Sequence, residues 1–249
     1  MLLAVDIGNS SIKFGVFDKD KLTAKLSIPT KRDYSVQEII EQAGDQIPAT
    51  VDAAIVCSVV PELDNAITNF VRNSFQIEPQ FVQPTDDLGL TINFNVDSTG
   101  MDRLVNSFAA AEKYGVPCVV VSFGTATTID VVNAEREYLG GLIAPGMKVS
   151  AQALSLATSK LPLVEIRKPE AVTAQTTEAA IRSGIVYGQI AMIEGLLKRV
   201  IDELNARPKV IATGGFAELL ASEIGMIDKL DHDLTLDGIF LLHKLKKKS

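Results

Sequence analysis

The stretch VVVSFGTATTIDVV (Val119–Val132) decides the fold, because it repeats a pattern found at the start of the chain. Near the N-terminus, LLAVDIGNSSIKFGV (Leu2–Val16) likewise runs from an apolar segment through small polar residues into a second apolar segment. The tripeptides Asp6-Ile7-Gly8 and Ser122-Phe123-Gly124 occupy matching places in the two stretches. Each stretch predicts two strands joined by a turn of small residues, so we expect a chain built from two similar halves.

The rest of the chain alternates strand patterns with helix patterns. DAAIVCSVV (52–60) is a continuous apolar run, as expected of a strand that is buried on both faces. Helical spacing of apolar residues follows in GMDRLVNSFAAAEKYG (100–115) and, in the second half, from Thr177 to about Asn205. We therefore expect an α/β fold with one domain at 1–115 and a second at 116–249, divided at a Gly-Val-Pro break.

The composition bounds the class of protein. The chain has 249 residues, 47% of them hydrophobic, which allows a sizeable core. No apolar run is long enough to span a bilayer, and the sequence MLLAVDIGNS lacks the basic start of a signal peptide, so we expect a cytoplasmic protein without a membrane partner. The net charge of −7 gives no help in binding nucleic acid. Cys57 and Cys118 lie in apolar runs, as small core residues do.

The duplicated turn has a chemical interpretation. A turn of glycine and small hydroxyl residues exposes backbone N–H groups that can cradle phosphate oxygens, although many hairpins use such residues merely to turn. Two copies predict two domains that hold the phosphates of one nucleotide in the cleft between them. A carboxylate beside phosphates is unfavourable unless a divalent cation intervenes, so Asp6 predicts Mg²⁺ held through water; the alternative is a turn-capping aspartate.

A second group of charged residues lies in the first half. Lys13 follows the first turn and is either a phosphate ligand or an exposed strand residue. In GMDR (100–103), Asp102 and Arg103 open a helix, where an aspartate often serves only as a cap. The same pair also makes a compact substrate site, because the carboxylate accepts a hydroxyl proton while the guanidinium binds an anionic group.

Taken in order, these motifs resemble those of the type III pantothenate kinases, a branch of the actin-like ATPase and sugar-kinase superfamily. The resemblance covers nearly the whole chain and rests on DIGNSSIKFG (6–15), CSVVP (57–61), GMDR (100–103), FGTATTID (123–130), GGLIAPG (140–146), TTEAAIRSGIVYG (176–188), ATGG (212–215) and DLTLDG (233–238). It implies two ribonuclease-H-like (actin-like ATPase) domains with a cleft between them.

The resemblance also implies a reaction, in which ATP phosphorylates pantothenate to 4′-phosphopantothenate in the first step of coenzyme A synthesis. ATP would be contacted by Asp6, Ile7, Gly8, Asn9, Ser10, Ser11, Ile12, Lys13, Thr125, Gly214 and Gly215. Pantothenate would be contacted by Phe94, Gly100, Met101, Asp102, Arg103 and Thr177, with Asp102 as the catalytic base. The family further implies Mg²⁺, a monovalent cation such as K⁺ or ammonium, and a homodimer in which Thr177 serves the neighbouring subunit's site.

Two positions depart from the family pattern. Ser122 stands where the family usually has an aspartate that binds the monovalent cation, and Phe94 stands where it usually has a tyrosine in the pantothenate pocket. The first change removes a negative charge and the second a hydroxyl group. Two alternatives therefore stay open: a related small-molecule kinase with another acceptor, and a regulatory nucleotide-binding protein without catalysis. Retention of Asp6 and Asp102 argues against the second.

Overall fold

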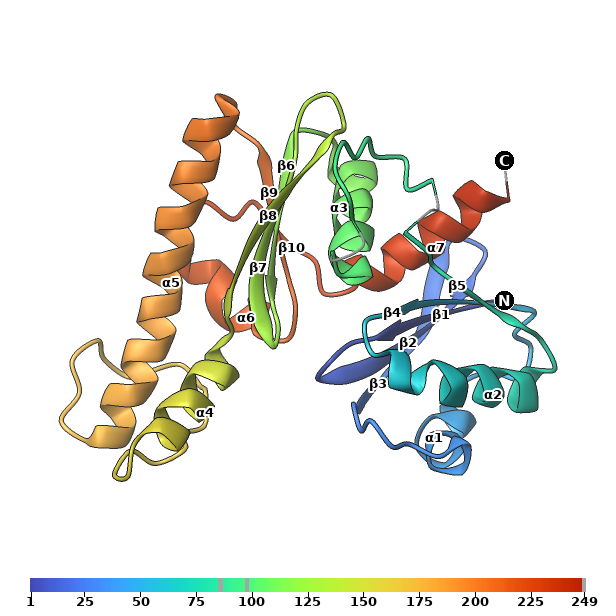
Figure 1. Cartoon of the computed structure of the whole chain (residues 1–249), viewed down its shortest axis with the longest axis horizontal. Coiled ribbons are helices and arrows are strands. Elements are labelled where there is room, and N and C mark those ends of the chain that lie inside the picture. Colours follow the sequence, from blue (N-terminus) through green and yellow to red (C-terminus); the bar gives the residue numbers. More distant parts are fainter. Residues whose placement is uncertain (85–86, 97–98, 248–249) are drawn as a thin grey trace. The chain divides into compact units, whose positions relative to one another are not determined.

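The computed structural model describes residues 1–84, 87–96 and 99–247, with the side chain of residue 45 excepted (Figure 1). These residues divide into two compact units, one comprising Met1–Ala109 together with Asp233–Ser249 and the other Ala110–His232. Each unit contains one five-stranded sheet. The α/β architecture expected from the sequence is confirmed.

The sheet of the first unit has the strand order β3-β2-β1-β4-β5. Its central strand β1 pairs antiparallel with β2 and parallel with β4, so the predicted hairpin and the predicted buried strand are both present. The outer strands β3 and β5 pair with β2 and β4 respectively. The strands are β1 (Leu2–Ile7), β2 (Ser11–Asp18), β3 (Lys21–Pro29), β4 (Ala53–Ser58) and β5 (Pro79–Phe81).

Helices cover both faces of this sheet. On one face, α1 (Val36–Ala43) and α2 (Asp64–Phe75) enclose a core cluster in which the rings of Phe14 and Phe70 meet edge to face at 5.9 Å. A capping box between Ser35 and Glu38 fixes the start of α1. The chain then continues through α3 (Met101–Tyr114), and short 3₁₀ helices lie at Gly44–Gln46 and Pro61–Leu63.

The C-terminal helix α7 (Leu234–Lys246) belongs to the first unit, although the sequence reading placed it with the second half. Its apolar residues Leu236, Ile239 and Leu242 are buried, and the Phe240 ring stacks on Phe17 of β2 with centroids 4.4 Å apart. These residues of α7 recur at helical spacing in the sequence. Only the tertiary structure shows which sheet the apolar face of α7 packs on, because the spacing of apolar residues in a helix does not specify the surface that covers them.

The sheet of the second unit repeats the first, with the order β10-β9-β6-β7-β8. Here β6 takes the place of β1, pairing antiparallel with β7 and parallel with β9. The strands are β6 (Cys118–Phe123), β7 (Ala126–Val132), β8 (Tyr138–Pro145), β9 (Lys209–Thr213) and β10 (Lys229–Leu230). The duplication expected from the two similar stretches is therefore confirmed at the level of strand order.

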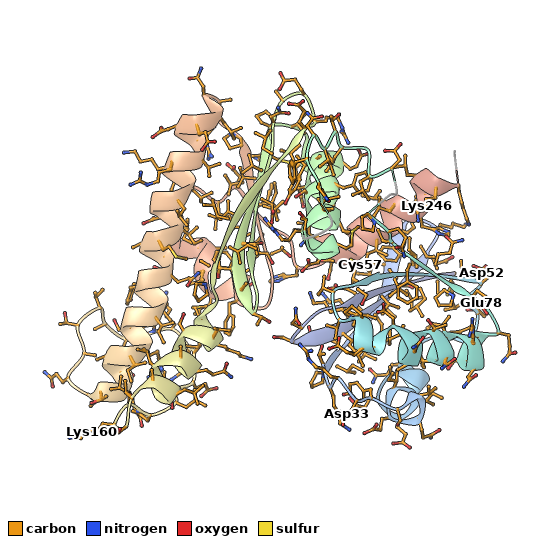
Figure 2. The ribbon with its side chains drawn as sticks, viewed as in Figure 1. Asp33, Asp52, Cys57, Glu78, Lys160 and Lys246 are labelled. Atoms are coloured by element: carbon orange, nitrogen blue, oxygen red, sulfur yellow. The ribbon has the colours of Figure 1, made fainter. Side chains whose placement is uncertain are left out.

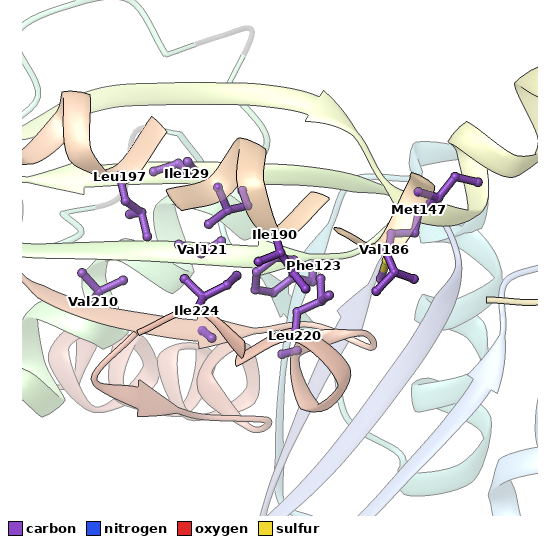
Figure 3. Close-up of a cluster of buried hydrophobic side chains, with 14 of the residues drawn as sticks. Val121, Phe123, Ile129, Met147, Val186, Ile190, Leu197, Val210, Leu220 and Ile224 are labelled. Atoms are coloured by element: carbon purple, nitrogen blue, oxygen red, sulfur yellow. The ribbon is translucent and has the colours of Figure 1, made fainter. Parts of the chain in front are cut away.

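The helices of the second unit include the long helix predicted from Thr177. It is α5 (Thr177–Leu204), and the others are α4 (Met147–Ala157), α6 (Ala217–Leu220) and a 3₁₀ helix at Ala221–Glu223. Figure 3 shows the core of this unit, in which sheet residues such as Phe123 pack with helix residues such as Leu197 and Leu220. In the described part of the chain, no helix is both long and apolar enough to cross a membrane.

Candidate active site

The first turn is a loop of four residues between the paired residues Ile7 and Ile12. Within it, the Gly8 N–H donates to the Ser11 carbonyl over 3.0 Å. Thr30, which follows β3, holds the loop from outside: its hydroxyl donates to the Gly8 carbonyl over 2.6 Å, and its N–H donates to the Ser10 carbonyl over 3.1 Å. Asn9 and Ser10 lie at the exposed tip, as a phosphate-binding turn requires.

The second turn is one residue shorter, because Phe123 and Thr127 are paired and enclose three residues. Its Gly124 N–H donates to the Ala126 carbonyl over 3.1 Å, and Thr125 is exposed at its tip. Gly146, just after β8, presses on this loop so closely that an added Cβ would lie 2.4 Å from the carbonyl oxygens of Gly124 and Thr125.

The double glycine after β9 has one position that only glycine suits. Gly214 has φ = +98°, and a Cβ there would lie within 2.7 Å of the Phe123 backbone. Gly215 has open space around its Cα. The sequence analysis expected both to contact ATP; in the structure, Gly214 supports the second loop through close backbone packing.

Asp6 is the penultimate residue of strand β1, and only 6% of its surface is exposed. Burial raises the pKa of its carboxyl group to about 6; the Lys13 ammonium, 3.5 Å away, lowers this pKa, and the negative charge of Asp102 raises it. Cys57, labelled in Figure 2, pairs with Asp6 across β1 and β4. Burial, and to a smaller extent the negative charges of Asp6 and Asp102, raise the pKa of the Cys57 thiol well above its usual range. The structure thus brings Asp6, Lys13 and Asp102 into one electrostatic environment.

Asp102 lies in the first turn of α3, as predicted. Its Oδ1 accepts the Arg103 backbone N–H over 2.9 Å, and a Cβ at Gly100 would come within 2.6 Å of the same oxygen. A side chain at position 100 would therefore displace this carboxylate oxygen from its place over the helix start. Met101 is buried at 8% exposure, so it supports the site from the core, whereas Asp102 and Arg103 are half-buried.

Ser122 takes the place in β6 that Asp6 takes in β1. It pairs with Thr128 on one side and Thr213 on the other. The Thr128 hydroxyl donates to Asp130 over 3.1 Å, and the Asp130 carboxylate also accepts the Tyr138 hydroxyl over 2.7 Å. Thr128 and Asp130 are two residues apart in β7 and so lie on the same face of the sheet, which is also the face of Ser122, the partner of Thr128. The buried carboxylate of Asp130, which sequence reasoning did not name, therefore lies on the same face as Ser122.

A buried hydrogen bond also supports the second loop, and sequence reasoning missed it. The side-chain amide of Gln189 on α5 donates to the Thr127 hydroxyl over 2.7 Å, next to the end of the loop. Gln189 is a polar residue on the face of α5 that carries Ile185, Ile190 and Ile193, and this interruption of an apolar stripe is the signal that would have identified it.

The two remaining predicted contacts of pantothenate belong to different units. Phe94, in the segment between β5 and α3 of the first unit, is 45% exposed. Thr177 is the first residue of α5 in the second unit, where Thr176 caps the helix by accepting the Ala179 N–H over 3.3 Å. Thr177 is exposed and lines a groove of about 630 Å³ along α4 and α5, together with Pro145, Leu154 and Ile181.

Within the described residues there is no group of three or more histidine, cysteine, aspartate or glutamate side chains placed to hold a metal ion. Mg²⁺ does not need such a group, because it usually keeps several waters and is bound through one or two carboxylates plus substrate phosphates. Asp6 is a buried carboxylate beside the first turn.

Solved structures with this fold include enzymes that act on sugars. The chain matches a putative Baf family transcriptional activator from Campylobacter jejuni (TM-score 0.64, 21% identity, 99% of this chain and 100% of that one). It also matches a ROK hexokinase from Thermus thermophilus (TM-score 0.50, 14% identity, 99% of each chain). The fold is therefore that of the two-domain actin-like ATPases and sugar kinases.

Sequence relatives narrow this class. The family model described as type III pantothenate kinase matches residues 2–199. Type III pantothenate kinases from Geobacter sp. (strain M21) and Citrifermentans bemidjiense are each 37% identical to the chain, covering 99% of it and 100% of the relative. The chain belongs to the type III pantothenate kinase family, and the resemblance noted in the sequence is confirmed.

The burial of Asp6 predicts a pH-dependent cost in stability. Since the pKa is about 6 when folded and near 3.8 when unfolded, the folded protein binds more protons between these values, and its stability falls as the pH rises through this window. Above pH 6 the full cost is present. Asp6→Asn should therefore raise the free energy of unfolding of the metal-free protein at pH 7.5 by about 3 kcal/mol, with the gain disappearing near pH 4.

Urea denaturation at pH 4, 5, 6 and 7.5 measures this difference. Asp33→Asn is the matched control, because Asp33 is an exposed aspartate in the same unit (Figure 2) and its replacement should give no such pH-dependent gain. A gain for Asp6→Asn that is equal at pH 4 and pH 7.5 would show that ionisation of Asp6 does not carry the cost.

Proposed function

We propose that this protein phosphorylates pantothenate with ATP to give 4′-phosphopantothenate, the first step of coenzyme A biosynthesis. The observation that carries the proposal is the grouping of Asp6, Lys13 and Asp102 beside the first glycine turn, in a chain of the type III pantothenate kinase family. Phosphoryl transfer needs charge neutralisation, positioning and a base for the accepting hydroxyl, and this group offers each of them.

The roles follow from the chemistry of each group. The loops around Gly8 and Gly124 offer backbone N–H donors and small side chains to the phosphates, and Lys13 adds a positive charge. Asp6 would hold Mg²⁺ through water. Burial disfavours the charged form of the Asp6 carboxylate, and a nearby divalent cation would stabilise that form. This supports the role of Asp6 in holding the cation. When bound, the cation would neutralise charge on the phosphates.

Pantothenate is proposed to bind at Gly100–Arg103. Arg103 provides a guanidinium for its carboxylate, and Phe94 provides an exposed ring in the same unit. Asp102 would accept the proton of the attacking hydroxyl. Its carboxylate is held at the helix start by the Arg103 N–H and fits there because residue 100 has no side chain. We propose neither a membrane nor a nucleic acid as a partner.

Asp102→Asn tests the catalytic base. The substitution keeps the shape of the side chain and removes its basicity, so kcat should fall by about 10²-fold or more while ATP binding is retained. Glu112→Gln, another acid-to-amide change on α3, is the control and should keep kcat within about twofold, because its ion pair with Arg136 is exposed. The measurement is a coupled assay of ADP release with pantothenate as acceptor.

The same assay distinguishes the kinase from a second candidate, a nucleotide-binding regulatory protein. Turnover of Asp102→Asn within a few-fold of the parent would remove Asp102 from the role of base. A parent that binds Mg²⁺-ATP without transferring phosphate to pantothenate would favour a nucleotide-binding regulatory protein, for which the replacement of the family's usual aspartate by Ser122 is the motivating observation.

We further propose a homodimer in which Thr177 completes the site of the neighbouring subunit. Leu154, which lines the same groove as Thr177, is 38% exposed, and Ile143 of β8, the strand whose Pro145 lines the groove, is 66% exposed. Exposed apolar surface of this kind is typical of protein interfaces. The buried stripe of α5, from Ile193 to Val200, packs in the core of its own unit, so the interface interpretation rests on the exposed residues instead.

Mixing two inactive variants tests the shared site. Asp102→Asn chains and Thr177→Ala chains are each expected to form impaired dimers. After random mixing, half of the dimers contain one chain of each kind, and each of these has one intact site, so activity should recover to about a quarter of the parent value. Absence of recovery, with mixed dimers confirmed by mass spectrometry, would show that each site is built from one chain.

The residue at position 122 bears on the binding of a monovalent cation. We propose that dependence on K⁺ or ammonium is weak, because a hydroxyl at position 122 is a poorer ligand for a hard cation than a carboxylate. The nearby Asp130 is already bonded to Tyr138 and Thr128 through its two oxygens.

A titration with KCl against tetramethylammonium chloride, at fixed ionic strength and saturating Mg²⁺-ATP, should give a nearly flat activity curve. Ser122→Asp should add K⁺ dependence and raise turnover. Ser122→Asn introduces a side chain of the same size as aspartate but without its charge, so it should neither add K⁺ dependence nor raise turnover. Steep activation of the parent that saturates at low K⁺ would mean that other ligands replace the missing carboxylate.

A further inference from the structure

The two phosphate loops are anchored by the same backbone bond. In each unit, the strand that flanks the hairpin ends in proline, Pro29 for β3 and Pro145 for β8. The following residue donates its N–H to a carbonyl of the loop: Thr30 to Ser10 and Gly146 to Thr125, each over 3.1 Å. Thr30 and Gly146 therefore occupy matching positions in the two halves, and their side chains can be compared directly.

The side chains at these positions differ for a steric reason. At Gly146, a Cβ would lie 2.4 Å from two loop carbonyl oxygens, so the shorter loop leaves no room for a side chain. The first loop has one more residue, and in the added space the Thr30 hydroxyl donates a second bond, to the Gly8 carbonyl over 2.6 Å. The first loop thus has two bonds from one residue where the second has one.

The two bonds orient two peptide groups of the first loop. In a trans peptide the carbonyl and the following N–H point in opposite directions. Fixing the Gly8 carbonyl toward Thr30 therefore turns the Asn9 N–H away from Thr30, and fixing the Ser10 carbonyl does the same for the Ser11 N–H. These are N–H groups of the loop that is proposed to bind phosphate, and donors oriented in advance bind an anion with less loss of entropy.

We infer that Thr30 is a positioning residue for nucleotide phosphates: its hydroxyl holds the Gly8–Asn9 peptide so that the Asn9 N–H faces the ligand. The inference rests on the proposed binding of ATP by this loop, and it assigns a role to a residue 22 positions beyond Gly8 in the sequence. The role is specific to phosphates, because the hydroxyl acts on the backbone donors of the loop.

Thr30→Val tests the role by replacing the hydroxyl with a methyl group of similar size. The affinity for Mg²⁺-ATP, measured by isothermal titration calorimetry on the full chain, should fall by about five- to tenfold, as expected from the loss of one neutral hydrogen bond. The affinity for adenosine, which has no phosphates, should stay within about twofold of the parent's. Thr30→Ser restores the hydroxyl and should return the ATP affinity to within about twofold of the parent's.

Thr23→Val is the matched control. Thr23 also lies on β3, and its hydroxyl donates to the Val16 carbonyl over 3.0 Å, at a distance along the strand from the loop. This variant loses the same kind of bond and should keep the parent affinity for both ligands. In steady-state kinetics, Thr30→Val should raise KM for ATP and leave KM for pantothenate unchanged.

Three results would overturn the inference: equal loss of ATP and adenosine affinity in Thr30→Val, an unchanged ATP affinity, or failure of Thr30→Ser to restore it. The test of Thr30 can still be interpreted if pantothenate is not the acceptor. A parent that binds ATP but does not phosphorylate pantothenate contradicts the proposed function, while a selective loss of ATP affinity in Thr30→Val still supports the role of Thr30.

Discussion

The burial of a carboxylate at the end of a core strand is the constraint on which the first unit depends. Asp6 follows four apolar residues of β1 and stays buried, close to the charges of Lys13 and Asp102. Such a group is costly in the free protein and is favoured when a cation is near. Functional sites often retain such unfavourable features, since activity requires them and the rest of the core supplies the stability.

The duplicated architecture shows how one backbone plan is adapted to two chemistries. Both sheets share a strand order, and both loops are closed from a flanking strand that ends in proline. In the first half an extra loop residue makes room for a threonine hydroxyl, and the penultimate residue of β1 is aspartate. In the second half glycines press directly on the loop, and the penultimate residue of β6 is serine. The first loop is thus tuned by side chains and the second by close backbone packing.

Much of the site was predictable because its signals are local in the sequence. An apolar run, a glycine and small polar residues identify a strand and its turn, and GMDR identifies an acidic helix start whose position the structure confirms. The supporting residues were not predictable in this way. Thr30 acts 22 residues from Gly8 and Gln189 acts 62 residues from Thr127, so neither is near its partner in the chain. The glycine at 146 is likewise explained only by the carbonyl groups that face it.

By itself the sequence determined the elements, their duplication and the family, because these depend on periodicity and on short motifs within each segment. It also marked Ser122 and Phe94 as departures from the family pattern. Only the tertiary structure decided that α7 packs on the first sheet, that Thr30 and Gly146 are equivalent, and that Asp130 shares a face with Ser122. The physical reason is that register and packing join residues far apart in the chain, and an apolar face or a hydroxyl group does not specify its partner in advance.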